Sequence, residues 1–239
     1  MPGFPGFPKE ALTFFRDLKK NNDREWFEAR RELFEAKVKA PMIALTAELN
    51  AELSKMAPDH VADPKKAIYR IYRDTRFSKD KTPYKTHIAA NFSHRLLDKH
   101  AGAGFYCAVS HESVDFGGGI YMPGPEEVLA LRTLFAERYE EFNRIAGAKP
   151  FRTLLGDVKG DQLTRAPKGF PADHPAESLL LRRKQWYWFV ELDAELALTA
   201  KLLPELKKRI YALLPAVEFL NAPLLVRQKN EARAAKFAG

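Results

Sequence analysis

The spacing of apolar residues changes from helical to alternating and back along this chain. Between residues 88 and 116, apolar side chains recur at every second position in three short runs, and a run of three glycines at 117–119 follows. On both sides of this region the apolar spacing is mostly helical, apart from the aromatic run WYWFV at 186–190. Alternation is typical of half-buried strands, and the longer period of amphipathic helices. The pattern predicts one α+β domain over residues 1–239, with a mixed or antiparallel sheet flanked by N- and C-terminal helices.

Proline, glycine and capping residues predict where the helices begin and end. Pro8 is placed to open a first helix that Asn21 and Asn22 end, and Asp23 can cap a second helix that reaches Val38. The sequence further predicts a helix from Pro41, a long helix from Pro125 to Gly147, and terminal helices broken at Pro204 and Pro215.

Composition limits the class of protein. Hydrophobic residues make up 46% of the chain and aromatic residues 12%, which indicates a packed core. The single cysteine, Cys107, excludes an intrachain disulfide framework and favours a reducing compartment. No segment approaches the roughly 18 apolar residues of a membrane span, and the N-terminus lacks the pattern of a signal peptide. We therefore predict a cytoplasmic protein without membrane contact, and the oligomeric state stays open.

Most of the excess positive charge lies in one segment, residues 65–87, which we call the basic block. It holds eight Lys or Arg against two Asp, a net charge of +6, whereas the whole chain has +8. Interleaved aromatic residues distinguish the block from a solvated lysine tail, and Pro83 favours a stiff turn over a helix interior. In this interpretation Tyr84 anchors the turn to the core, while Lys81 and Lys85 project away from it.

Two interpretations of the basic block remain open. In the first, its cationic heads bind phosphate or carboxylate, because arginine presents a rigid fork to oxyanions. In the second, Asp74 and Asp80 neutralise neighbouring cations in an internal ionic scaffold, with Tyr84 as its structural anchor. The candidate anion-binding residues are Arg70, Arg73, Arg76, Lys79, Lys81 and Lys85.

Several blocks of the sequence resemble a known family. These are the FF and NN pairs followed by WF at 14–27, the segment RIYRDTRFSKDKTPYKT at 70–86, and GGIYMP at 118–123. PKGF at 167–170 and the pair His174 and Pro175 complete the set. Together they are similar to the family called domain of unknown function 2461. The resemblance implies one continuous domain and carries over no catalytic residue, since no activity is established for that family.

Catalytic candidates are few. His87 directly follows the basic block and is the first candidate for a general acid or base, with a hydrogen-bonded strand histidine as the alternative; Asp80 is the second. His94, His100 and His111 lie nearby in sequence, but no metal-binding spacing is present, so no metal or organic cofactor is predicted. The three glycines match no phosphate-binding motif and favour close backbone packing.

Aromatic residues after a basic triplet form a second possible ligand surface. Trp186 and Trp188 follow Arg182, Arg183 and Lys184, and could stack on nucleic acid bases if their rings were exposed. Burial in the core is the alternative. The sequence thus favours a protein that binds, or acts on, a phosphorylated or otherwise anionic ligand such as a nucleotide or nucleic acid. The alternative is a non-enzymatic structural or interaction protein, and enzymatic activity stays undecided.

Overall fold

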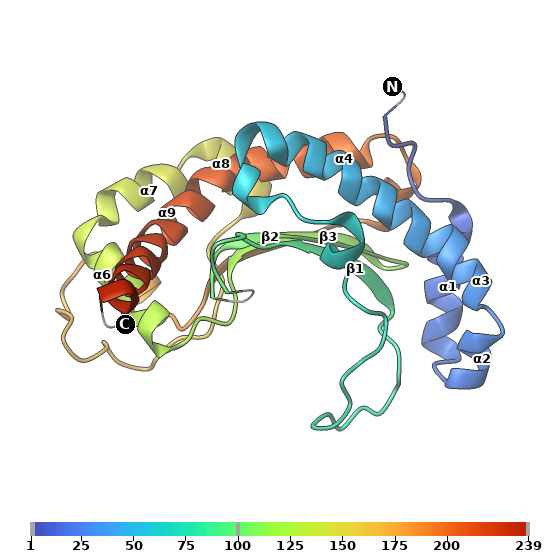
Figure 1. Ribbon diagram of the computed structural model, residues 1–239, viewed down its shortest axis with the longest axis horizontal. Coiled ribbons are helices and arrows are strands. Elements are labelled where there is room, and N and C mark those ends of the chain that lie inside the picture. The colour runs from blue at the N-terminus through green and yellow to red at the C-terminus, as the bar shows by residue number, and fades with distance from the viewer. Residues whose placement is uncertain (1–2, 99–100, 238–239) are drawn as a thin grey trace. The chain divides into compact units, whose positions relative to one another are not determined.

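A computed structural model describes residues 3–98 and 101–237 (Figure 1). Four strands form one antiparallel sheet in which each strand pairs with its neighbour in sequence, in the order β1-β2-β3-β4. Together with the helices, this sheet confirms the predicted α+β class. Of the two predicted sheet types, mixed and antiparallel, the structure has the antiparallel one. The strands are β1 (His87–Phe92), β2 (Gly104–Ser110), β3 (Ser113–Ile120) and β4 (Trp186–Asp193).

The chain divides into two compact units. The first comprises Met1–Phe92, Tyr106–Phe116 and Glu191–Lys208, and the second comprises Ser93–Phe105, Gly117–Val190 and Arg209–Gly239. Strands β2, β3 and β4 therefore contribute residues to both units, as does the last helix. The prediction of a single domain stays a prediction.

Helices of the first unit begin close to the predicted signals. Helix α1 starts after Pro8 and ends at Asn21, and Asp23 accepts a hydrogen bond from the Trp26 N–H at the start of α2. The second predicted helix was wrong in one respect: it is interrupted near Arg30 and continues as a π turn. The elements are α1 (Lys9–Lys20), α2 (Arg24–Glu28), α3 (Arg31–Phe34), η1 (Glu35–Lys39), α4 (Ala40–Met56), η2 (Pro58–His60), α5 (Pro64–Ala67) and η4 (Ala194–Leu198).

In the second unit, the long helix predicted from Pro125 to Gly147 is wrong as a single element. It breaks at Arg138, whose φ of −127° and ψ of 35° are not helical, and the two parts are α6 and α7. Ring contacts of Phe142 with both Phe135 and Phe219 fill the space beside this break, so core packing offsets the lost helical hydrogen bonds. The elements are α6 (Pro125–Glu137), α7 (Tyr139–Ala146), α8 (Lys149–Leu155) and η3 (Glu177–Leu181).

The last helix, α9 (Leu202–Phe237), corrects the predicted breaks at Pro204 and Pro215. Pro204 lies in its first turn, where the missing N–H costs nothing, and Pro215 and Pro223 lie inside it. Among the described residues, this helix over Leu202–Arg233 is long and apolar enough to cross a membrane. Half of its apolar window is buried inside the protein, and a soluble core helix passes the same test.

The apolar residues that alternate in the sequence are buried on β1, β2 and β3, but β2 is buried at six of its seven positions, so its second face is not fully exposed. In the first unit, Ile88, Cys107 and Val114 are buried, and helix α4 packs against β1. The intervening residues share the opposite face of the pleat. In the second unit, the glycines lie inside β3: a Cβ built on Gly119, whose φ is +113°, would stand 2.3 Å from the Trp186 carbonyl oxygen. This glycine therefore permits close backbone packing, which the sequence favoured over a phosphate loop.

Candidate functional site

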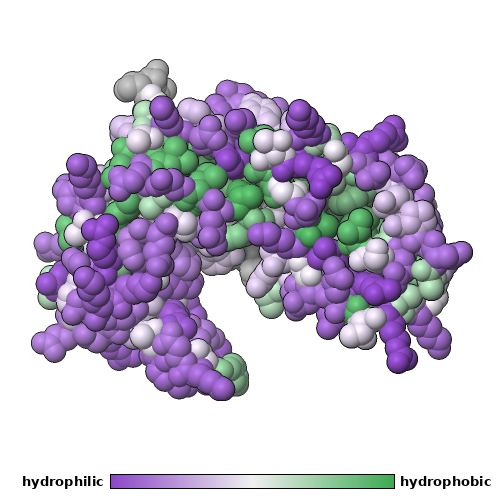
Figure 2. Space-filling model, turned by 180° about the vertical axis from the view of Figure 1, so that it is seen from behind, coloured by the Kyte–Doolittle hydropathy of each residue, from purple (hydrophilic) through white to green (hydrophobic). Residues whose placement is uncertain are grey.

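Residues 68–86 of the basic block form a two-armed extension between α5 and β1. Its arms pair in antiparallel fashion: the Lys85 N–H donates to the Ile71 carbonyl over 2.8 Å, and the Arg73 N–H donates to the Pro83 carbonyl over 2.9 Å. Figure 1 shows the extension leading away from β1, and Figure 2 shows it as a mostly hydrophilic projection. As expected from Pro83, the segment is an extended turn structure rather than a helix.

The base of the extension is anchored by Tyr84. Its ring is 1% exposed and stacks on Phe27, with the ring centroids 4.1 Å apart. The Asn22 side chain binds both backbone groups of Tyr84. Its Nδ2 donates to the Tyr84 carbonyl (2.9 Å), and its Oδ1 accepts from the Tyr84 N–H (3.0 Å). Asn22 was missed as a clamp: the sequence suggested it only as a helix end.

Two arginines near the tip are paired with the two aspartates of the block. Arg76 donates twice to the Asp74 carboxylate, over 3.0 and 2.8 Å, and these bonds lower the pKa of Asp74 to about 2. The Arg73 guanidinium donates to Asp80 and to the Thr82 hydroxyl. The Thr82 N–H and Arg73 lower the pKa of Asp80 to about 2. Asp80 is thus an ion-paired carboxylate, an arrangement that does not suit a general acid.

Lys81 and Lys85 do not project from the extension as expected. The Lys81 ammonium donates to the Thr75 carbonyl (2.8 Å), and the Lys85 ammonium donates to the Arg70 carbonyl (3.0 Å). Lys85 also lies over the Tyr69 ring, 5.2 Å from its centroid. Backbone carbonyls are good partners for ammonium groups, so both lysines stabilise the extension while keeping their positive charge.

The remaining cations of the basic block face solvent. Their side chains form no hydrogen bond or ion pair within residues 3–98 and 101–237; they are Lys65, Lys66, Arg70 and Lys79. Phe77 at the tip is 95% exposed, and the Arg76 guanidinium lies 5.7 Å from its ring centroid. The tip therefore presents an aromatic ring beside the ion-paired Arg76, and Lys79, which has no such partner, follows two residues later in sequence.

His87 begins β1 at the base of the extension. Burial and the Lys85 charge lower the pKa of His87, and Asp115 on β3 opposes that change. Tyr106 on β2 belongs to the same environment, since burial and then the Asp115 charge raise its pKa. Within the described chain, the His87 ring makes no hydrogen bond, so the structure does not show the hydrogen-bonded strand histidine that was the alternative to a general acid or base. Tyr106 and Asp115 were missed, although the alternation already placed them opposite the apolar face.

The structure gives no catalytic role to the other histidines that the sequence singled out among the residues it describes. His94 is buried, and its Nδ1 accepts from the Leu96 N–H, whereas His100 lies outside the described residues. The side chain of His111 is 12% exposed in the turn between β2 and β3. In the parts of the chain that the structure describes, no group of three or more His, Cys, Asp or Glu is placed to hold a metal ion.

Two further side-chain groups are excluded as ligand surfaces. Trp186 and Trp188 are 0% and 1% exposed, so the hypothesis of a base-stacking platform on β4 is wrong and the core interpretation holds. Cys107 is buried, and burial raises the pKa of its thiol to about 12. Such a thiol stays protonated at neutral pH and is a poor nucleophile.

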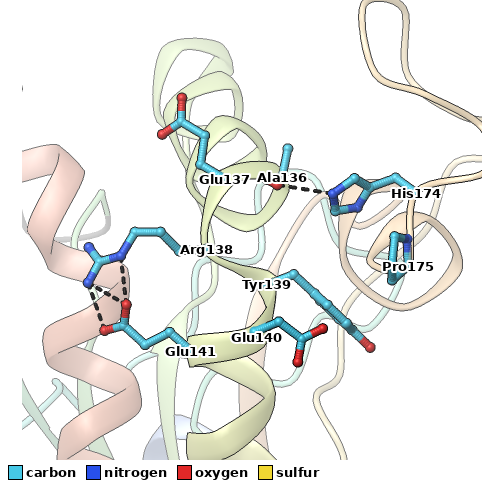
Figure 3. A pocket seen from close by; sticks show the side chains of 8 residues that line it. All are labelled: Ala136, Glu137, Arg138, Tyr139, Glu140, Glu141, His174 and Pro175. Carbon is cyan, nitrogen blue, oxygen red and sulfur yellow. Dashed lines mark hydrogen bonds and ion pairs between the residues drawn. The ribbon is translucent and has the colours of Figure 1, made fainter.

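In the second unit, an open pocket of about 390 Å³ lies where α6 meets α7 (Figure 3). His174 and Pro175 line it, and His174 bonds to the Ala136 carbonyl through Nε2. Arg138 and Glu141 point to the other side of the helix and pair through two hydrogen bonds of 2.7 Å. These polar groups already have protein partners, so they fix the α6–α7 junction.

The fold and the extension define a class: an α+β protein with an antiparallel sheet and a projecting basic arm before its first strand. The chain belongs to the family described as conserved hypothetical protein DUF2461, whose model matches residues 10–219. The match covers most of the chain and includes the whole basic block. No curated protein and no solved structure matches the chain.

Proposed function

We propose that this protein binds single-stranded nucleic acid through the extension. Phosphates of the strand lie against the solvent-facing cations, and a base stacks on Phe77. The observation that carries the proposal is the combination of unpaired cationic heads with an aromatic ring that is 95% exposed. The buried thiol of Cys107 suits a reducing compartment, so we place this binding in the cytoplasm.

The charge arrangement supports binding to a polymer of phosphates. Arg70 on the first arm and Lys79 at the tip face solvent, and the exposed Lys65 and Lys66 lie in α5, directly before the extension in sequence. Ion pairs of Arg73 and Arg76 hold the tip in one shape without using the exposed heads. A phosphate backbone that binds these cations releases its own counterions, which favours binding at low salt.

Phe77 gives the proposal its single-stranded character. An unpaired base presents a π face that an exposed aromatic ring can stack on, whereas the bases of a duplex are already stacked. A large apolar side chain at the end of a hydrophilic projection has no structural role in the core. Its exposure favours a ligand that covers it.

The alternative is that the extension is only a scaffold for contacts within the protein. The observations that favour it are the two Arg–Asp pairs and the anchor formed by Asn22 and Tyr84. They explain the rigidity of the arm. They do not explain why Arg70, Lys79 and Phe77 are presented to solvent.

The proposal is tested by fluorescence anisotropy with a labelled oligothymidylate at a series of salt concentrations. We expect log K to fall linearly with log salt, with a slope of about −3 if four phosphates are neutralised. The double variant Arg70→Ala/Lys79→Ala should reduce this slope by about 1.4. Phe77→Ala should weaken binding by about fivefold or more while leaving the slope unchanged.

The control for the Arg70→Ala/Lys79→Ala variant must remove two positive charges outside the extension. Lys201 and Lys208 are exposed residues of the first unit outside the extension, so Lys201→Ala/Lys208→Ala is the matched double variant. It should bind like the wild type. Equal losses for both double variants, or no binding by the wild type at low salt, would reject the extension as a nucleic-acid site and favour the scaffold.

A further inference from the structure

In the second unit, His174 contacts two separate parts of the backbone through the two nitrogens of its ring. Its Nε2 lies 3.0 Å from the Ala136 carbonyl oxygen in the last turn of α6. Its Nδ1 lies 3.1 Å from the backbone nitrogen of Ala176, which directly precedes η3. Figure 3 shows the contact with Ala136 beside the pocket at the α6–α7 junction. His174 lies 38 residues after Ala136, so one side chain joins the end of α6 to the start of η3.

These two contacts determine which ring nitrogen of His174 carries the proton. A backbone N–H can only donate, so Nδ1 accepts from Ala176 and carries no proton. A carbonyl can only accept, so Nε2 carries the proton and donates to Ala136. The second bond also satisfies one of the carbonyls that the end of a helix leaves without a helical partner. The two contacts together therefore require the neutral form of the ring.

A second proton on the ring is incompatible with one of the two bonds. An imidazolium carries an N–H at both nitrogens and has no acceptor, so its Nδ1–H would face the N–H of Ala176. Ala176 is 0% exposed, and a buried N–H that loses its partner is destabilising because water does not replace the bond. The carbonyl of the same residue accepts from the N–H groups of Leu180 (2.8 Å) and Leu181 (2.9 Å). Protonation of His174 therefore acts on the residue that starts η3.

The titratable and charged groups around His174 come from α6, α7, η3 and its own segment. Those of α6, α7 and the residue between them line the pocket together with His174; they are Glu137, Arg138, Tyr139, Glu140 and Glu141. The Tyr139 ring meets the His174 ring edge-on, with the centroids 6.3 Å apart. Arg138 pairs with Glu141, Glu177 of η3 pairs with Arg182, and the exposed Asp173 precedes His174 in sequence. Glu137 and Glu140 form no ion pair within the described chain, so the pocket offers negative charge to an imidazolium.

We propose that His174 is a proton-operated latch at the α6–α7 junction. At neutral pH the ring binds both the end of α6 and the residue before η3. In acid the ring keeps its bond to the Ala136 carbonyl and releases the Ala176 N–H, so the segment that leads into η3 detaches and the pocket opens. Histidine side chains ordinarily titrate at about pH 6.5, which places the release within the physiological range. The latch lies in the second unit and does not depend on the function proposed for the extension.

Hydrogen exchange of the Ala176 amide, followed by NMR, tests the latch. The wild type is measured on both sides of the ordinary histidine titration, at about pH 7.5 and about pH 5.5, and each rate is divided by that of an unstructured amide at the same pH. We expect the protection of Ala176 to fall about fivefold or more in acid, because one hydrogen bond of a buried N–H is lost. The amide of Leu220, which is buried in α9 of the same unit, should change less and so separates local release from global unfolding.

Two variants separate the roles of the two ring nitrogens. His174→Asn keeps a carbonyl oxygen for the Ala176 N–H and cannot be protonated, so Ala176 should stay equally protected at both pH values. His174→Gln places an amide donor against the Ala136 carbonyl and provides no acceptor for Ala176, so Ala176 should be weakly protected at both. His111→Gln, which removes a histidine of the first unit, is the matched control and should keep the wild-type response.

Two results would overturn the proposal. One is a wild-type protection of Ala176 that is equal at both pH values, and the other is a pH response that persists in His174→Asn. If neither His174 variant folds, the nitrogen chemical shifts of the wild-type His174 ring decide. An Nδ1 that takes up a proton as Ala176 loses protection supports the latch. An Nδ1 that already carries the proton at neutral pH, or a protonation that leaves Ala176 protected, rejects it.

Discussion

The arginines of the extension differ in what their guanidinium groups contact. Arg76 binds both oxygens of Asp74, and the low pKa of that carboxyl, about 2, keeps the pair charged at every physiological pH. Arg70, six residues away, is exposed and makes no such pair within the described residues. The sequence gives the net charge of +6 for the basic block. It does not show which arginine and lysine side chains form ion pairs and which remain free to bind a ligand, because the pairing depends on how the turn folds.

Tyr84 is the residue whose loss should damage the extension most. Tyr84→Ala removes a ring that is 1% exposed and stacked on Phe27, so we expect the free energy of unfolding to fall by about 3 kcal/mol or more. Urea unfolding followed by fluorescence measures this loss. Tyr72→Ala is the control, since that ring is 42% exposed and its removal should cost clearly less. Equal losses would show that burial of Tyr84 does not anchor the arm.

His87 should make the stability of the protein depend on pH. Burial lowers its pKa in the folded state below the usual 6.5, so the unfolded chain binds more protons between the two values. Stability is then fully present above about pH 6.5 and decreases as pH falls toward the folded-state pKa. We expect His87→Gln to lose less Tm than the wild type between about pH 7 and about pH 5. His111, whose pKa is also lowered, contributes to the dependence that remains.

An unchanged pH dependence in His87→Gln would mean that this ring is as hydrated in the folded protein as in the unfolded chain. The double variant with His111→Gln separates the two histidines. Since both pKa values are lowered mainly by burial, the double variant should be the least sensitive to acid of the three.

At the scale of the element, the extension depends on a clamp from a distant part of the chain. Asn22 lies 62 residues from Tyr84, and its amide satisfies both the N–H and the carbonyl of that residue. The pair of asparagines reads in the sequence as a helix end, which is correct for Asn21, the C-cap of α1. Nothing in local sequence reveals that the next side chain turns toward the extension.

Asn22→Ala should loosen the extension more than the rest of the protein. The substitution leaves the N–H and carbonyl of Tyr84 without partners, which costs about 1–3 kcal/mol per group when water cannot replace the lost bond. Hydrogen exchange of the Tyr84 amide and limited proteolysis at residues 74–82 should both become faster. Asn21→Ala is the matched control, because the Asn21 side chain bonds only to the Asp17 carbonyl at the surface. An extension that stays equally protected in Asn22→Ala would contradict the clamp.

Helices and strands were predicted well where one apolar periodicity dominated the segment. They were predicted less well where tertiary packing determined where an element breaks or continues. The strands begin within a residue or two of the alternating runs, since a strand that buries one face allows little freedom of register. The break at Arg138 carries no glycine or proline, so no sequence signal marks it, and the packing of Phe142 against Phe135 and Phe219 stabilises it. Conversely, Pro215 lies inside α9 because buried neighbours such as Leu213 and Val217 offset one lost hydrogen bond.

At the scale of the molecule, the fold brings together residues that are distant in sequence, whereas the leading candidate site comes from one segment. The basic block is contiguous, so composition alone identified it. The Arg132 side chain donates to the carbonyl of Arg183, 51 residues further along the chain, and no local pattern in the sequence indicates this contact. Tyr106 and Asp115 come from two strands, and only the paired sheet brings them to the environment of His87. Sequence reasoning therefore found the candidate site made by local charge and missed the contacts made by the fold.

The two units should unfold in one cooperative transition. Strands β2, β3 and β4 and helix α9 each contribute residues to both units, so neither unit is an uninterrupted segment of chain. Unfolding one unit disrupts elements that continue into the other, which favours two-state behaviour. In scanning calorimetry we expect a single peak whose calorimetric enthalpy equals its van't Hoff enthalpy.

Variants in each unit make this test sharper. Tyr84→Ala destabilises the first unit, and Gly119→Ala destabilises the second, because its new Cβ would stand 2.3 Å from the Trp186 carbonyl oxygen at a φ of +113°. Each substitution should shift the same single peak to lower temperature. Gly169→Ala, at a φ of +88° but with no atom within 4 Å of the new Cβ, separates backbone strain from steric clash and should shift it less. Two peaks, each moved by only one of the variants, would show that the units are independent domains and that the prediction of a single domain is wrong.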